Sequence, residues 1–283
     1  MDPARCPTRS LRCMEIWGGN SAVAEAFETP GLDGWVFSRP YEQAEGGGDV
    51  HYVSLCGGGI ITRMIIADVS GHGAAVAEVA RSLRAMMRRN INRKSQARLV
   101  RELNRQFAEL AQLRQFATAV VATYLANKRR LTVCNAGHPA PLWYRADRHQ
   151  WTLLNHATAE RGPAAANLPL GIDEAGAYDQ FAVVLGRDDL LIFGTDALIE
   201  AADPSGRMLG EEGLLELARG LDRAEPAQLG PALLEAVECH RGGAPAEDDV
   251  TLLALHHNAR GPRRMSVGEK LDVYAKVFGL RAV

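Results

Sequence analysis

The chain has 283 residues, of which 47% are hydrophobic and 23% are charged, so it can form one large globular domain or two small ones. Its 32 basic and 34 acidic residues give a formal net charge of −2, which excludes nucleic-acid binding driven by bulk positive charge. The five cysteines are widely spaced and form no CxxC pair, which argues against a zinc or redox site and favours a reduced, cytoplasmic setting.

The first residues do not have the pattern of an export signal. Residues 1–12 carry charge and proline instead of the apolar core of a secretory signal peptide. No run of about 18 apolar residues occurs that would span a bilayer. We therefore expect a cytoplasmic protein with no membrane partner.

A β-hairpin is predicted around residues 57–59. The segments 50–55 and 60–68 are apolar and rich in β-branched side chains, and the three glycines between them indicate a tight turn. The two strands should therefore pair in antiparallel fashion. This pairing brings Asp49, at the start of one strand, close to Asp68, at the end of the other.

The other predicted elements alternate between strands and helices. Residues 14–40 are interpreted as irregular, apart from a short strand at 34–38. After the hairpin, helices are expected at 74–89, 96–113, 211–221 and 226–240, and strands at 117–126, 130–135, 141–144, 151–154, 180–185, 189–193 and 250–256. Antiparallel neighbours and paired helices indicate an α+β fold, in which two sheets pack face to face between helices.

Five short motifs follow one another along the chain: GGD ending at Asp49, ADVSGHG at 67–73, NAGHPAP at 135–141, TDALIE at 195–200 and DDVTLL at 248–253. Their order resembles the SpoIIE/RsbU-type branch of the PPM (PP2C-like) serine/threonine phosphatases, over about residues 30–257. The resemblance implies a four-layer α-β-β-α sandwich, with two mainly antiparallel sheets flanked by helix pairs.

The resemblance also divides the chain into three parts. Its extent implies an N-terminal segment at 1–29 and a PPM-type phosphatase domain at 30–258, and the residue pattern that follows predicts a linker with a C-terminal amphipathic helix at 259–283. In the last part, Ser266 and Glu269 have the spacing of a capping box. Because a helix this short is marginal alone, its apolar face should pack on the domain, on a second copy in a homodimer, or on another partner.

Clustered acidic side chains point to divalent metal ions. Carboxylates that share a site cannot all stay ionised without cations, because each raises the pKa of the others. Oxygen ligands without Cys or His at metal-ligand spacing favour two Mn²⁺ or Mg²⁺ ions over zinc. Two such ions can activate a water that attacks a phosphoryl group, so no phosphoenzyme forms.

The resemblance assigns a role to each predicted metal ligand. Asp68 would bridge both ions, and the backbone carbonyl of Val69 would assist it. Asp49 would bind one ion, while Asp196 and Asp248 would bind the other. These four aspartates are also the predicted catalytic residues.

Several other polar residues each have two interpretations. His72 and His138 lie in glycine-flanked turns, where they could donate a proton to the leaving group or anchor the turn by hydrogen bonds. Glu200 could order its helix or a metal-bound water. Arg161 and Arg187 could meet a phosphate or lie solvated on the surface.

Three positions bear on how closely the chain follows the family pattern. Asp249 stands where relatives often carry asparagine, and we interpret it as a supporting residue behind the ligands. Tyr52 stands three residues after Asp49, where a second acid is common, so one carboxylate of the site is expected to be missing. Ala197 replaces the glycine of a TDG turn, and a left-handed backbone at alanine costs about 1–2 kcal/mol. We therefore expect a reshaped turn or a slightly displaced site.

Three functions are consistent with these features. The leading hypothesis is a metal-dependent phosphatase that acts on phosphoserine or phosphothreonine of a protein; the resemblance implies a STAS-type anti-sigma-factor antagonist in a partner-switching pathway. The alternative is a catalytically weak relative that serves as a binding module in such a pathway, which Tyr52 and Ala197 favour. A hydrolase using Ser70 and His72 is disfavoured, because the GxSxG elbow is absent.

Overall fold

The computed structural model describes residues 8–261 and Gly268, apart from residues 14, 72, 91, 92, 94, 111–114, 160–166 and 222–224. The predicted C-terminal helix therefore lies outside the described residues, as do His72 and Arg161. In the part of the chain that is described, no helix has both the length and the apolar character that a bilayer span requires.

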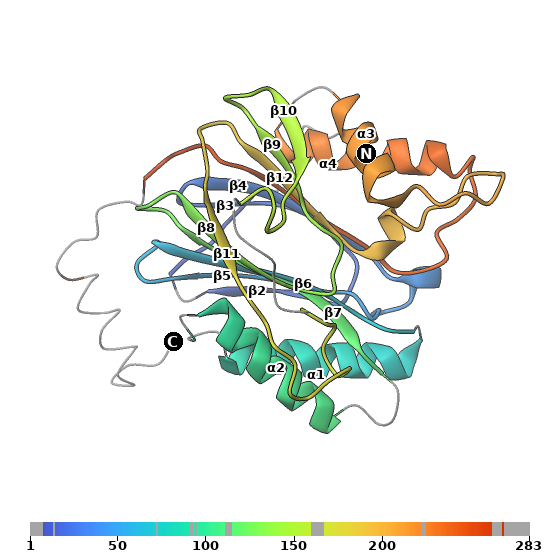
Figure 1. Cartoon of the computed structure of the whole chain (residues 1–283), viewed down its shortest axis with the longest axis horizontal. Coiled ribbons are helices and arrows are strands. Elements are labelled where there is room, and N and C mark those ends of the chain that lie inside the picture. Colours follow the sequence, from blue (N-terminus) through green and yellow to red (C-terminus); the bar gives the residue numbers. More distant parts are fainter. Residues whose placement is uncertain are drawn as a thin grey trace.

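Two β-sheets are stacked on each other (Figure 1). One consists of β1 (Thr8–Ser10), β3 (Val23–Thr29), β4 (Leu32–Arg39), β9 (Leu142–Arg145), β10 (Gln150–Leu153), β12 (Leu190–Gly194) and β13 (Val250–His256). The other consists of β2 (Ile16–Gly19), β5 (Val50–Cys56), β6 (Ile61–Val69), β7 (Ala117–Leu125), β8 (Arg130–Ala136) and β11 (Phe181–Val184). Their strand orders are β1-β3-β4-β13-β12-β9-β10 and β11-β8-β7-β6-β5-β2.

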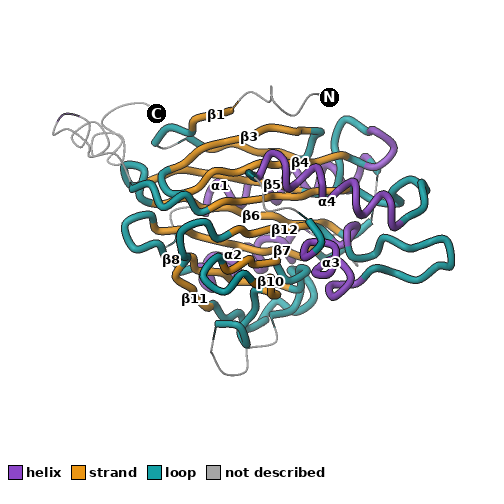
Figure 2. The backbone as a smooth tube through the Cα atoms, turned by 90° about the horizontal axis from the view of Figure 1, so that it is seen from above, coloured by secondary structure: helices purple, strands orange, loops and turns teal. Residues whose placement is uncertain are grey.

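The pairing within the sheets is mainly antiparallel. In the described residues β1 and β3 are the one parallel pair of strands. Seen from above, the strands of both sheets run in nearly the same direction (Figure 2). This is the aligned type of sheet packing, in which the two inner faces interdigitate over their whole length.

Helices cover both outer faces of the stacked sheets. The pair α1 (Ala74–Asn90) and α2 (Gln96–Leu110) lies on the six-stranded sheet, and α3 (Gly210–Arg219) and α4 (Pro226–His240) lie on the seven-stranded one (Figure 1). The predicted α+β sandwich of four layers is thereby confirmed.

Three apolar layers hold the sandwich together, one between the sheets and one under each helix pair. Strand β6 contributes to two of them because successive side chains point to opposite faces. Met64 and Ile66 are buried between the sheets, whereas Ile65 and Ala67 are buried under α1 and α2. Burial on both faces explains why this segment reads as a continuous apolar run.

The predicted hairpin of β5 and β6 is confirmed. The strands pair in antiparallel register from Val50 opposite Ala67 to Cys56 opposite Ile61. The glycines at 57–59 have φ values of 61°, 71° and 84°, which side chains rarely adopt. The turn therefore requires glycine.

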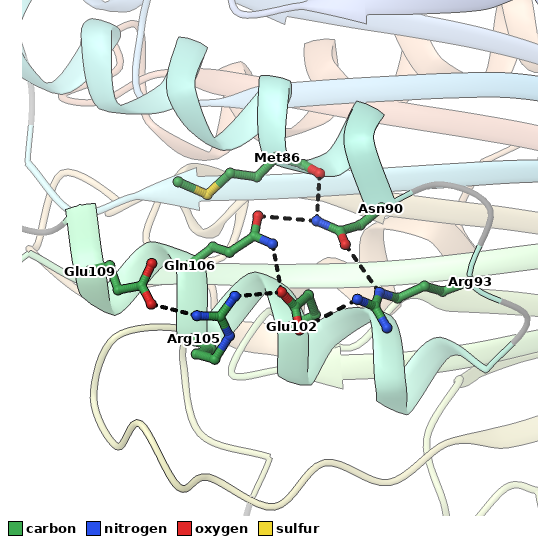
Figure 3. Close-up of polar contacts among 7 residues, drawn as sticks. All are labelled: Met86, Asn90, Arg93, Glu102, Arg105, Gln106 and Glu109. Atoms are coloured by element: carbon green, nitrogen blue, oxygen red, sulfur yellow. Dashed lines mark hydrogen bonds and ion pairs between the residues drawn. The ribbon is translucent and has the colours of Figure 1, made fainter.

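A polar network joins the C-terminal end of α1 to the middle of α2 (Figure 3). The side-chain amide of Asn90, a residue that is only 7% exposed, donates to the carbonyl of Met86 at 3.0 Å and to Oε1 of Gln106 at 3.1 Å. Gln106 in turn donates to Glu102 at 2.7 Å, and Arg93 donates to Oδ1 of Asn90 at 3.1 Å. These bonds fix the two helices as a pair while their apolar stripes face the sheet.

The strand predicted at 34–38 is confirmed as part of β4, but the prediction that the rest of residues 14–40 is irregular is wrong, because this segment also contains β2 and β3. Strand β3 pairs along its whole length with β4, across a turn at Pro30 and Gly31. Two glutamates, Glu25 and Glu28, weaken the apolar alternation of β3 in the sequence, and the pairing overrides that low propensity. The sheets thus include residues that the sequence assigned to a separate segment at 1–29.

Candidate functional site

The predicted acidic residues lie at one end of the sandwich. Asp49 immediately precedes β5, and Asp68 is the next-to-last residue of β6, so both belong to the six-stranded sheet. Asp196 begins the 3-10 turn η3 (Asp196–Leu198) after β12, and Asp248 lies two residues before β13, so these belong to the seven-stranded sheet. The stacking of the sheets brings the two pairs together.

Asp49 is the most buried of these carboxylates, with 2% exposure. Its Oδ2 accepts a hydrogen bond from Oγ1 of Thr195 at 3.0 Å, whereas its Oδ1 is buried and has no hydrogen-bond partner among the described residues. Burial, and after it the charge of Asp68, raises the pKa of Asp49 well above its usual range. A bound cation would stabilise such a buried carboxylate oxygen that has no hydrogen-bond partner.

Asp68 and Asp196 experience the same conflict of like charges. Burial, followed by the charges of Asp196 and Asp248, raises the pKa of Asp68 to about 8. Burial, followed by the charges of Glu200 and Asp248, raises the pKa of Asp196 to about 6. The donor set consists of carboxylates that repel one another, so it fits hard divalent cations.

Asp249 supports the loop that carries Asp49. Its Oδ1 accepts the N–H of Tyr41 at 2.6 Å, and its Oδ2 accepts the N–H of Gly48 at 2.5 Å and of Asp49 at 3.4 Å. A side chain at Gly47 would collide with the Asp249 carboxylate. The loop therefore needs small residues, and Asp249 holds it through its backbone.

Thr195 links the two sheets at the site, a role that was not predicted from the sequence. Its hydroxyl donates to Asp49 and accepts the backbone N–H of Thr251 at 3.0 Å. Its backbone N–H donates to the carbonyl of Thr251 at 3.1 Å. The sequence does contain a signal for this role, because Thr195 directly precedes Asp196 in one motif and Thr251 lies in another.

The turn at Ala197 is reshaped, which is one of the two outcomes expected from the sequence. Ala197 is the central residue of η3, and its φ angle is not positive. It is buried, with 5% exposure, and its carbonyl accepts a hydrogen bond from Nη2 of Arg241 at 2.6 Å. A 3-10 turn accommodates alanine without strain, and Arg241 is a second residue that the sequence analysis did not identify.

His138 is fully enclosed by the fold. Its Nδ1 lies 2.9 Å from Oγ1 of Thr118, and its backbone N–H donates to Oδ1 of Asn135 at 2.8 Å. Burial lowers the pKa of His138 to about 3, so the ring is neutral at neutral pH. Of the two interpretations, these contacts favour the anchor over the proton donor.

Arg187 and Tyr52 lie away from the acids. Arg187 lies at the opposite end of β12, where its side chain is 77% exposed and 3.8 Å from the carboxylate of Asp188. Tyr52 is 1% exposed in the apolar layer under α1 and α2, so an aromatic ring fills the space at this position. Neither residue contributes a polar group to the site.

Two clefts reach Asp248 from the surface. One, of about 430 Å³, is also lined by Glu200, Asp203, Met208 and Arg241. The other, of about 390 Å³, is also lined by Arg241 and by residues 39–43. Asp248 is therefore accessible to a group presented by another molecule.

A tighter cluster of possible ligands lies at the other end of the sandwich. In the described part of the chain, the one group of three such side chains whose donor atoms all lie within 4.8 Å consists of Asp33, Glu225 and His256. Among the described residues of the acidic site, no three ligand atoms from different side chains lie this close together.

Sequence comparison identifies the family. The sequence model of stage II sporulation protein E (SpoIIE) matches residues 61–258, which is more than half of the chain. The chain belongs to the SpoIIE family. A curated relative, the phosphoserine phosphatase RsbP of Bacillus subtilis (strain 168), is 29% identical over 142 residues, which cover 48% of this chain and 33% of RsbP. The matched part thus amounts to about a third of that relative's length.

Solved structures share the architecture. The RsbU and RsbW domains of Rv1364c from Mycobacterium tuberculosis give a TM-score of 0.69 at 24% identity, covering 92% of this chain and 70% of that one. The PP2C phosphatase domain of SpoIIE from Bacillus subtilis, with a fragment of its regulatory domain, gives 0.65 at 17% identity, covering 86% and 71%. At these identities the similarity establishes the fold, and the SpoIIE family member described here is PP2C-like.

Proposed function

We propose that this SpoIIE family member is a metal-dependent protein phosphatase that hydrolyses phosphoserine or phosphothreonine. One observation carries the proposal: Asp49 is buried with a free carboxylate oxygen, in a group of acids that both sheets contribute. One structural neighbour, RsbX, was solved in complex with magnesium, which agrees with this donor set.

The residues that would hold two such ions are the predicted ones. Asp68 would be the ligand shared by both ions, because the charges of Asp196 and Asp248 act on it and its own charge acts on Asp49. The carbonyl of Val69 would assist it. When bound, the two ions would supply a water of lowered pKa beside the phosphoryl group.

The remaining groups orient these ligands and do not react themselves. Thr195 and Asp249 fix the side chain and the backbone of Asp49. The hydroxyl of Ser70 accepts the N–H of Phe116 at 3.1 Å, which ties it into the turn after β6. This contact supports a phosphatase without a serine nucleophile.

The substrate that we propose is a phosphorylated protein of the STAS type in a partner-switching pathway. RsbP, the curated relative, is named a phosphoserine phosphatase, and the clefts beside Asp248 leave room for a phosphorylated side chain. We also place the protein in the cytoplasm, where such pathways operate. The cysteines Cys13, Cys56, Cys134 and Cys239 are free thiols, as expected in a reducing compartment.

A second candidate is a catalytically weak binding module in the same kind of pathway. Tyr52 favours it, because an aromatic ring occupies the position where relatives commonly carry an acid. Ala197 no longer supports this candidate, since its backbone is unstrained.

Hydrolysis of p-nitrophenyl phosphate with and without Mn²⁺, followed by the same assay on a phosphorylated STAS protein, tests the proposal. We expect Mn²⁺-dependent turnover that Asp68→Asn and Asp196→Asn abolish, because each variant loses a charged ligand but keeps its shape. Asp147→Asn, at a side chain that is 66% exposed, is the control and should behave as the wild type. Full turnover in either ligand variant would remove the dinuclear site. Absence of turnover in the wild type, with binding of the STAS protein, would favour the binding module.

A further inference from the structure

Arg241 lies between the two segments that carry Asp196 and Asp248. It directly follows α4 as the C-cap residue, where its backbone N–H donates to the carbonyl of Val237 at 3.1 Å. From Arg241 the chain continues through the loop 241–248 to Asp248. The side chain of Arg241 extends instead to η3, the turn that begins with Asp196.

The guanidinium of Arg241 holds η3 by its backbone. Within the turn, the carbonyl of Asp196 accepts the N–H groups of Ile199 and Glu200, both at 2.8 Å. The carbonyl of the next residue, Ala197, accepts a hydrogen bond from the guanidinium Nη2 of Arg241 at 2.6 Å. The arginine therefore fixes the orientation of the turn that presents the Asp196 carboxylate.

The environment of Arg241 is unusual for a side chain that only caps a helix. The residue is 7% exposed, and a buried cation is costly unless neighbouring groups compensate it. Burial lowers the pKa of Arg241, and the charges of Glu238 and Glu247 act in the opposite direction. The side chain also lines both clefts that reach Asp248.

We propose that Arg241 is a positioning residue of the metal site. By tying η3 to the start of the loop 241–248, it sets the separation of Asp196 and Asp248, so that both carboxylates can bind the same cation. The inference rests on the proposed function, because it takes these two residues as ligands of one ion. Replacing a group that orients metal ligands typically weakens metal binding by about 10–100-fold.

Calorimetric titration of the metal-free protein with Mn²⁺ tests this role apart from catalysis. We expect Arg241→Met to weaken the binding of one of the two ions by about 10-fold or more. Arg241→Lys keeps the charge and one donor, so it should recover part of this loss and remain about threefold weaker than the wild type.

Arg39 provides a matched control. It lines one of the same clefts, but its side chain is 43% exposed and bonded to Glu238 at 3.4 Å instead of to η3. We expect Arg39→Met to bind Mn²⁺ within about twofold of the wild type, because an exposed ion pair contributes little.

If Arg241→Met binds Mn²⁺ as tightly as the wild type and only its melting temperature is lower, the proposal is overturned. Arg241 would then serve only to cap the helix. If circular dichroism shows that Arg241→Met is unfolded, Arg241→Lys decides, and an affinity equal to that of the wild type overturns the proposal.

Asp196→Asn, titrated in parallel, separates this proposal from the proposed function. If it loses one ion while Arg241→Met loses none, only the role of Arg241 fails. If Asp196→Asn binds both ions normally, the ligand assignment fails and the role of Arg241 with it.

Discussion

At the scale of single residues, Asp249 supports the site indirectly, because both of its carboxylate oxygens accept hydrogen bonds from backbone N–H groups. We predict that Asp249→Asn lowers the free energy of unfolding by about 1–3 kcal/mol, because an amide NH₂ replaces one oxygen and leaves a buried N–H group without an acceptor. Urea unfolding measures the loss. Asp147→Asn, at an exposed side chain, is the control, and an equal stability for both variants would contradict this reading of Asp249.

Ala197 leads to a prediction opposite to the one that its motif suggests. If the turn were left-handed, glycine would relax it. Because η3 has right-handed geometry and Ala197 is 5% exposed, Ala197→Gly removes a buried methyl group and adds backbone freedom. We expect the free energy of unfolding to fall by about 1–2 kcal/mol. Thermal or urea unfolding checks this, and a stabilised variant would show that the turn is strained after all.

The sequence predicts those residues whose role is encoded locally. Asp49 and Asp68 are brought together by one hairpin, whose apolar strands and glycine turn are visible in the sequence. Arg241 could not be found in this way, because its contact with Ala197 spans 44 positions and depends on how α4 lies on the sheet. Thr195 lies between these cases, since its motif is visible but its bond to Asp49 spans 146 positions.

At the scale of secondary-structure elements, the boundaries predicted from the sequence are wrong where pairing with another strand determines the structure. Strand β3 is held in the seven-stranded sheet between β1 and β4, where the exposure of its side chains alternates. In the sequence alone, its two glutamates are typical of a polar segment. The turn at Pro30 and Gly31, where Gly31 has φ of 88°, is the one local signal of that hairpin. Strands β5 and β6 were predictable because both faces of each are buried, so the apolar run is continuous.

The packing of α4 on the seven-stranded sheet depends on Gly230. A side chain at this position would collide with the ring of Trp35 in β4. We predict that Gly230→Ala destabilises the protein, because overpacking costs about 1–3 kcal/mol and outweighs the gain of about 1 kcal/mol in helix propensity. Gly220→Ala is the matched control, since its φ is −77° and the nearest atom would lie 3.4 Å away.

Urea unfolding of both variants provides the measurement. Gly220→Ala should stay within about 0.5 kcal/mol of the wild type. A stabilised Gly230→Ala variant would mean that α4 can shift away from Trp35 at little cost.

His256, at the end of β13, connects three other elements. Its Nδ1 lies 3.6 Å from the carboxylate of Asp33 and 3.7 Å from that of Glu225, and its Nε2 lies 3.1 Å from the carboxylate of Asp188. The Asp33 carboxylate, with smaller contributions from Asp188 and Glu225, raises the pKa of His256 above its usual value. A raised folded-state pKa stabilises the protein below the unfolded value of about 6.5, and the contribution is lost as pH rises through the folded value.

We therefore predict that His256→Gln lowers stability more at pH 6 than at pH 9. Urea unfolding of wild type and variant at both pH values gives the difference. Asp33→Asn should flatten the same pH dependence, because it removes the main cause of the shift. An equal loss at both pH values would show that His256 contributes by packing alone.

For the whole molecule, aligned stacking of the sheets collects four aspartates, two from each sheet, at one end of the sandwich. At this end, burial and after it the charges of neighbouring acids raise the pKa of both Asp49 and Asp68. Such a site reduces the stability of the metal-free fold and is relieved by a ligand that binds only the folded state. Metal binding and global stability should therefore be linked.

We predict that Mn²⁺ at about 100 times its dissociation constant stabilises the wild type by about 2.7 kcal/mol, which corresponds to a rise in melting temperature of roughly 5–10 °C. In EDTA, Asp68→Asn should melt above the wild type, because it removes one of the repelling charges, and it should lose most of the response to Mn²⁺. Asp147→Asn should respond to Mn²⁺ as the wild type does. Differential scanning calorimetry in EDTA and in Mn²⁺ measures all three proteins. If Asp68→Asn keeps the full rise, the ions bind elsewhere; if it melts below the wild type in EDTA, the Asp68 carboxylate is stabilised by the fold itself, and the acidic end of the sandwich is not the source of the linkage.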